Sequence, residues 1–119
     1  MPELLIVDDI PAVHDMLEPL FQHEGYTCHR AHSADEAVAF LQNQSCDIAL
    51  IDYYMPVEDG LILSKDILQG YPGIKIVMMS GYFDDKLRNA ARDAGIHALV
   101  EKPFNMRELV ETINRIEKS

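Results

Sequence analysis

Five polar side chains in this sequence each stand at or just beyond the end of a short apolar run. They are Asp8, Asp9, Asp52, Ser80 and Lys102. Such runs are typical of buried strands in a parallel sheet, and in an open sheet of that kind sites form beyond the carboxyl ends of the strands. We therefore expect three acids, one hydroxyl and one ammonium to meet at one edge of a sheet.

The three acids predict a bound divalent cation. Carboxylates about 4 Å apart repel each other by about 4 kcal/mol per pair at an effective dielectric constant of roughly 20. Asp8, Asp9 and Asp52 together would destabilise the fold unless a cation lay among them, and their oxygens suit Mg²⁺ or Mn²⁺. A single aspartate after a strand is more simply explained as a helix N-cap, and Asp9 before Pro11 could be only that. The group of three favours the cation.

The hydroxyl and the ammonium extend this chemistry. Acids, a cation, Ser80 and Lys102 form a set suited to making a carboxylate attack a phosphorus atom. The cation would neutralise phosphoryl oxygens that otherwise repel the nucleophile, and the other two groups would hold the remaining oxygens. The same set is poorly suited to binding an organic anion through a glycine-rich loop.

The segments that must position these groups alternate between apolar runs and amphipathic stretches. Runs without polar alternation predict strands buried on both faces by helices. The segment 27–31 is the most polar and is the expected edge strand. The five expected strands lie at 4–7, 27–31, 48–51, 74–79 and 98–100.

Signals for the starts of helices lie between these runs. Pro11 suits a first helical position, and Ser33 and Asn105 each stand three residues before a glutamate, the spacing of a capping box. Pro19 fits poorly inside the first helix. The helix expected within 84–94 presents mostly alanines, so we expect it to be the most loosely held. Helices should end at Gly25, Gly70 and Gly95.

Composition narrows the class of protein. A length of 119 residues predicts a single domain over 1–119. The net charge of −10 disfavours direct binding to nucleic acid, because an acidic surface repels phosphate backbones. The chain has no apolar run long enough for a membrane span, and its only cysteines, Cys28 and Cys46, lack paired spacing. The first residues show neither a basic lead nor a small-residue cleavage site, so we expect no secretory signal. These features predict a reduced, cytoplasmic protein without a disulfide.

Four segments together resemble the receiver domain of two-component response regulators, over essentially the whole chain. They are LLIVDD at 4–9, ALIDYYMPVEDG at 49–60, VMMSGY at 77–82 and VEKPF at 100–104. Each is weak alone, but all four in this order and spacing are highly specific. The resemblance implies a CheY-like (flavodoxin-like) doubly wound (βα)₅ α/β fold with a parallel five-stranded sheet in order 2-1-3-4-5.

The same resemblance assigns roles to the acids and to their neighbour. Asp52 would be the phosphoacceptor. Asp9 would ligate the metal directly, and Asp8 partly through water. The backbone carbonyl of Tyr54 would be a further metal ligand.

Beyond the acids, the resemblance makes Ser80 the switch hydroxyl and Lys102 the family's lysine, and it predicts a cis peptide before Pro103. The family commonly has an aromatic side chain three residues before that lysine, and here the residue is Leu99. The conformational change that signals phosphorylation would then pass through backbone shifts or through another side chain, such as Tyr82 or Phe83.

Two tyrosines stand at positions that tune the lifetime of the phosphoryl group in the family. Tyr54 follows Asp52 by two residues, and Tyr82 follows Ser80 by two. Two phenols in the in-line path of water predict a long-lived phosphorylated state. Alternatively, one or both simply lie on the surface.

The implied function is a signalling switch that phosphorylates and dephosphorylates itself rather than a turnover enzyme. Its phosphodonor would be a sensor histidine kinase or a phosphotransfer protein. Its output would pass to a downstream protein, or to a phosphorylation-promoted dimer, through the fourth helix, fifth strand and fifth helix.

Three alternatives stay open. One is a protein-binding module on the same fold that works without phosphorylation. An aspartate-nucleophile phosphatase would need two aspartates at i and i+2, whereas Asp8 and Asp9 are adjacent, and a flavin carrier would need a Ser/Thr-rich loop there. The five histidines show no metal-ligand spacing and are interpreted as surface or packing residues: His14, His23, His29, His32 and His97.

Overall fold

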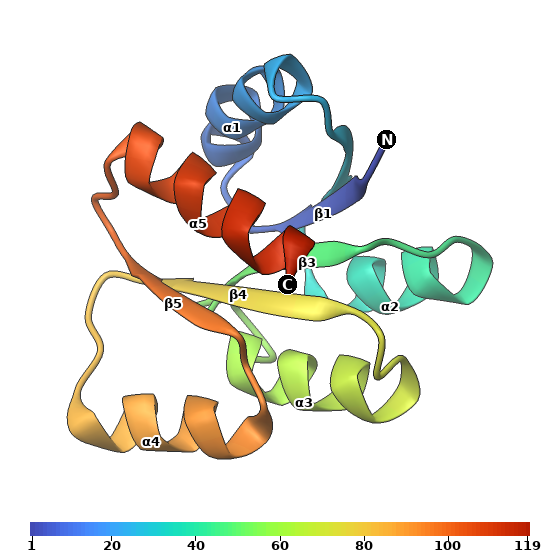
Figure 1. The fold of residues 1–119 in the computed structure, drawn as a ribbon. Coiled ribbons are helices and arrows are strands. Elements are labelled where there is room, and N and C mark those ends of the chain that lie inside the picture. The colour runs from blue at the N-terminus through green and yellow to red at the C-terminus, as the bar shows by residue number, and fades with distance from the viewer.

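The computed structural model describes residues 1–119, in which five strands alternate with five helices (Figure 1). The strands are β1 (Glu3–Val7), β2 (Thr27–Ala31), β3 (Ile48–Asp52), β4 (Lys75–Ser80) and β5 (Ala98–Glu101). The helices are α1 (Pro11–His23), α2 (Ala34–Asn43), α3 (Gly60–Gly70), α4 (Asp85–Ala94) and α5 (Met106–Lys118). None of these helices has the length and hydropathy needed to cross a bilayer.

All five strands pair in parallel, in the order β2-β1-β3-β4-β5. The predicted order is confirmed, and so is the position of 27–31 at an edge. Val7 pairs with Ile51, and Asp52 pairs with Met79, so the strands end close together. In Figure 1 their carboxyl ends lie at the left of the sheet.

Helices cover both faces of the sheet, with α1 and α5 on one side and α2, α3 and α4 on the other (Figure 1). Alternation along β1 divides the core accordingly. Leu4 and Ile6 pack with α1 and α5, whereas Leu5 and Val7 pack with α2 and α3. Burial on both faces explains why residues 4–7 of β1 are continuously apolar.

The predicted helix starts are observed. Ser33 accepts a hydrogen bond from the backbone N–H of Glu36 (3.1 Å), and Asn105 accepts one from Glu108 (3.1 Å). Pro11 is the first residue of α1, which continues through Pro19 without a break. Gly25 and Gly95 follow their helices with positive φ, whereas Gly70 is the last residue of α3.

Helix α4 buries the least of any helix. Only its Ala91 is buried, and it packs in a small cluster with Met78 and Phe83. Asp84 caps the helix by accepting a hydrogen bond from the N–H of Leu87 (2.8 Å). This thin packing follows from the alanine-rich face seen in the sequence.

Candidate functional site

Three carboxylates meet at the carboxyl edge of the sheet. Asp8, Asp9 and Asp52 each contribute one oxygen to a group whose members all lie within 4.8 Å of one another. Asp8 is 0% exposed and Asp52 is 4% exposed, whereas Asp9 is half-buried. The pairing of β1 with β3 brings the acids together, because Asp8 follows Val7 and Asp52 follows Ile51.

One ammonium joins two of these acids. The Nζ of Lys102 lies 3.2 Å from Asp8 Oδ2 and 3.4 Å from Asp52 Oδ1. Lys102 is positioned by its backbone, whose N–H donates to the carbonyl of Ser80 (2.8 Å) at the end of β4. The peptide between Lys102 and Pro103 is cis, which confirms the prediction.

The electrostatics of this cluster favour a bound cation. Burial raises the pKa of Asp52, and the charge of Asp8 raises it further, while Lys102 lowers it. The raising effects win, because burial and the charge of Asp8 together outweigh the nearby ammonium. Oxygen ligands this close together suit a divalent cation such as Mg²⁺, so the residues fit the metal that the sequence predicted.

Ser80 lies at the same edge and is buried, at the end of β4. Its hydroxyl makes no hydrogen bond to the acids. It donates instead to the carbonyl of Tyr82 (2.9 Å), and its oxygen lies 3.3 Å from the N–H of Tyr82, which donates to it. The side chain therefore closes a turn that leads toward α4.

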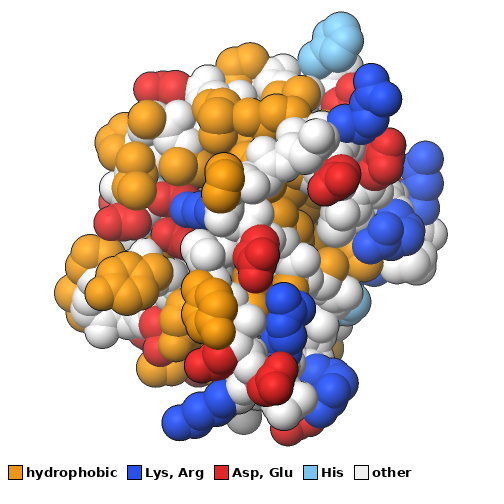
Figure 2. Space-filling model, turned by 90° about the vertical axis from the view of Figure 1, so that its left-hand side faces the viewer, with side chains coloured by type: hydrophobic (Ala, Val, Ile, Leu, Met, Phe, Trp, Pro, Cys, Tyr) orange, Lys and Arg blue, Asp and Glu red, His pale blue; other side chains and the backbone are white.

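The two tyrosines flanking the site stand in solvent. Tyr54 is 82% exposed and Tyr82 is 72% exposed. Figure 2 looks onto the carboxyl edge of the sheet and shows hydrophobic side chains gathered around acidic ones there. Leu99 is half-buried on β5 and pairs with Met78, so no aromatic side chain fills that position. The Tyr54 carbonyl stays a predicted ligand.

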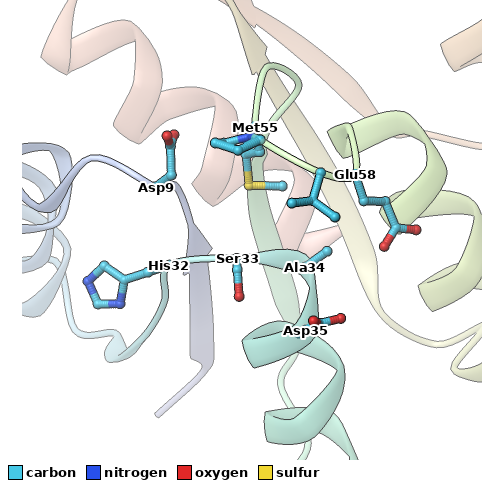
Figure 3. Close-up of a pocket in the computed structure, with 9 residues that line it drawn as sticks. Asp9, His32, Ser33, Ala34, Asp35, Met55 and Glu58 are labelled. Carbon is cyan, nitrogen blue, oxygen red and sulfur yellow. The ribbon is translucent and has the colours of Figure 1, made fainter.

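A hollow of about 160 Å³ opens beside the acids, between the loops that follow β2 and β3. Figure 3 shows Asp9 at one end of it, with Met55 and Glu58 toward the other. Val57 lies in the same loop, fully exposed, at a φ of 73° that a β-branched side chain rarely adopts. Asp9 is thus the acid of the cluster that reaches an open surface.

Gly60 was not among the predicted site residues, although it packs directly against the backbone of Asp52 and Tyr53. Its N–H donates to the carbonyl of Tyr53 (2.7 Å), and a Cβ on it would lie closer than 3.0 Å to the carbonyl oxygen of Asp52. Asp59 caps α3 by accepting a hydrogen bond from the backbone N–H of Ile62 (2.9 Å). The Asp-Gly pair that ends the 49–60 segment was the available signal.

The contact made by His14 was also missed. This residue is buried in α1, as a packing residue would be, but its Nε2 lies 2.7 Å from the carbonyl oxygen of Asp8. No spacing in the sequence indicates such a contact, since it depends on how α1 turns back over the end of β1.

Known proteins share this fold and motif order. The family model of the response regulator receiver domain matches residues 4–114. The nitrogen assimilation regulatory protein NtrX of Azorhizobium caulinodans is 31% identical over 115 residues, covering 95% of this chain and 25% of NtrX. A CheY-like receiver domain protein from Methanospirillum hungatei superposes with a TM-score of 0.95 at 31% identity, covering 99% of this chain and 94% of that one. The response regulator TrrA of Thermotoga maritima, solved in complex with Mg(2+)-BeF, gives 0.87 at 28% identity, covering 98% and 99%.

The five-stranded parallel sheet and its edge site define the CheY-like class of doubly wound α/β domains. Within that class, the chain belongs to the response regulator receiver domain family, as the resemblance predicted. The chain spans less than half the length of the first curated relatives that it matches, from 12% to 49%.

Proposed function

We propose that the chain is a phosphorylation-dependent signalling switch that accepts a phosphoryl group on Asp52. The observation that carries this proposal is the convergence of Asp8, Asp9 and Asp52 with one lysine that contacts two of them. Burial and, next, the charge of Asp8 raise the pKa of Asp52, so the ionised carboxylate is costly where it stands. A divalent cation would relieve that cost.

The transfer step follows from the chemistry of the carboxylate. An oxygen lone pair of Asp52 attacks phosphorus, a new O–P bond forms, and the bond from phosphorus to the donor nitrogen breaks with its electron pair left on the donor. Asp9 and Asp52, with Asp8 and the carbonyl of Tyr54, would hold Mg²⁺ or Mn²⁺. When bound, that ion supplies neutralisation of the phosphoryl oxygens.

Lys102 is placed to stay beside the transferred group. Its Nζ already lies 3.4 Å from an Asp52 oxygen, so it can pair with a phosphoryl oxygen attached there. Ser80 must give up its bonds to Tyr82 to reach the same group. Release of the Tyr82 backbone would disturb the start of α4. This disturbance would carry the signal even though Leu99 stands where the family commonly has an aromatic residue.

The partners follow from this function. We propose a sensor histidine kinase or a phosphotransfer protein as donor and an unidentified downstream protein, or a dimer, as the output across α4, β5 and α5. The domain would work in the cytoplasm as a switch that hydrolyses its own phosphoryl group, not as a turnover enzyme. The net charge of −10 makes direct binding to nucleic acid unfavourable.

A second candidate is a binding module that works without phosphorylation. It is favoured by Leu99, which stands where the family commonly has an aromatic residue, and by the Ser80 hydroxyl, which bonds Tyr82 rather than the acids. The two candidates predict opposite results in one experiment.

That experiment incubates the domain with acetyl phosphate and Mg²⁺ and weighs the intact protein. One phosphoryl adduct, absent with EDTA, supports the switch. No adduct under any condition contradicts it and favours the binding module, and steady turnover of added phosphate esters would favour a phosphatase.

A further inference from the structure

We infer that His14 is a positioning residue that sets the metal-binding geometry of the acid pair, an inference that rests on the proposed function. The imidazole is 0% exposed and stands on the buried face of α1, where its neighbours Leu17 and Phe21 are apolar. A buried polar ring at such a place calls for a specific partner. The partner is the backbone carbonyl of Asp8, 2.7 Å from Nε2.

The hydrogen bond fixes which nitrogen carries the proton. A carbonyl oxygen only accepts, so Nε2 must be the donor. Nδ1 then has no hydrogen-bond partner, and it is the only buried side-chain nitrogen or oxygen in the protein left in that condition. The bond to Asp8 is therefore the one hydrogen bond that the ring makes.

That bond completes the restraint of Asp8. The Asp8 N–H donates to Ala31 (3.1 Å), and its carboxylate accepts from the N–H of Ile10 (2.9 Å) and from Lys102 (3.2 Å). With the bond from His14 to the Asp8 carbonyl, every polar group of Asp8 makes a hydrogen bond. Because this carbonyl belongs to the peptide that joins Asp8 to Asp9, holding it fixes the direction in which Asp9 leaves the strand.

His14 is itself held against the start of α2. Its ring packs on the ring of His32, with centroids 4.6 Å apart, and His32 contacts Glu36 through both its backbone N–H and its Nδ1. Since Asp8 also bonds directly to Ala31, the residue before His32, the acid pair is tied twice to one junction. Asp9 is the half-buried acid with the fewest restraints of its own, so it depends most on this support.

Three substitutions of His14 distinguish its role as a hydrogen-bond donor to Asp8 from its role in packing. His14→Gln keeps an N–H donor at a reach similar to Nε2, His14→Asn has a donor that is too short, and His14→Leu has none. Binding of Mg²⁺ alone to the unphosphorylated domain is measured by isothermal titration calorimetry, with thermal unfolding in EDTA as the check of folding. His29→Leu is the matched control, because that histidine bonds Glu3 at the other end of the sheet.

We expect the Leu and Asn variants to bind Mg²⁺ about 10-fold more weakly, the scale seen when a group that orients a ligand is lost. The Gln variant should stay within about threefold of the wild type, like His29→Leu. If the wild type binds Mg²⁺ and all three variants match it, or all three weaken equally, the inference about His14 is wrong while the proposed function stands. If the wild type binds no Mg²⁺, the proposed function fails as well.

Discussion

The domain has two halves that are packed very differently. The first half is the centre of the sheet, β1 and β3, and the second is the edge strand β5 with the neighbouring helix α4. The first is flanked by clusters of 14 and 12 buried residues, whereas the cluster under α4 holds 3. All residues of β3 are buried, whereas β5 has no fully buried residue. Asp8 and Asp52 stand on the first half, and the turn of Ser80 and Tyr82 leads into the second.

The two regions are suited to different roles, because one is strongly restrained and the other is not. Carboxylates that repel one another stay in place only if the backbone that carries them is strongly restrained, and β1 and β3 supply that restraint. Elements that move are drawn from the less stable parts of a protein, where few apolar contacts must break. Under the proposed function, the chemistry would therefore belong to the first half and the response to α4 and β5.

The largest expected effect comes from removing the ammonium that links the two halves. Lys102→Ala should slow formation of the phosphoryl adduct about 100-fold, the usual loss when one group that stabilises developing charge is removed. Initial rates with acetyl phosphate at saturating Mg²⁺ measure it. Lys65→Ala, on the exposed face of α3, is the control. Equal rates for the two variants would mean that the Lys102 ammonium does not assist phosphoryl transfer.

Gly60 tests how tightly the first half is packed. Gly60→Ala should lower the free energy of unfolding by about 1–3 kcal/mol, because the added methyl would overlap the backbone of Asp52 and Tyr53. Urea denaturation measures the change. Gly70→Ala, at the last residue of the same helix with nothing within 4 Å of its Cβ position, is the matched control. A Gly60 variant as stable as that control would mean that this half is looser than we describe.

The acid cluster also predicts a pH dependence. Because burial and Asp8 raise the pKa of Asp52, the folded protein holds that proton more tightly than the unfolded chain does. The ionised form therefore costs stability above the raised pKa. That cost disappears as the pH falls through the raised pKa toward the ordinary value of 3.8.

Asp52→Asn removes this cost. Without Mg²⁺, the variant should be more stable than the wild type at neutral pH, with the difference fading in acid. Thermal unfolding across the pH range measures it. A difference that is constant with pH, or a wild type that is the more stable at pH 7, would contradict the assigned electrostatics.

The smallest effect is expected from the exposed phenols. If Tyr54 and Tyr82 crowd the path of water, Tyr54→Ala and Tyr82→Ala should each speed decay of the phosphorylated state several-fold without slowing its formation. Tyr71→Ala, an exposed residue after α3, is the control. Unchanged decay would mean that both rings simply lie on the surface.

Most of the fold could be predicted from sequence because its signals are local. Apolar runs identified β1, β3, β4 and β5, and the capping roles of Ser33 and Asn105 follow from spacing alone. The contact of Gly60 with Asp52 and that of His14 with Asp8 could not be predicted, because they depend on the path of the chain between elements. The Ser80 hydroxyl shows a further limit, since its type indicated a ligand for phosphoryl oxygens but not its bonds to Tyr82.

The most direct test of the account locates the phosphoryl group. The domain is phosphorylated with acetyl phosphate and Mg²⁺, reduced with borohydride, which converts an aspartyl phosphate to homoserine, and mapped by tandem mass spectrometry. The account predicts homoserine at position 52 alone, and none in Asp52→Asn or in EDTA. Homoserine at position 8 or 9, or an adduct that survives in Asp52→Asn, would contradict it.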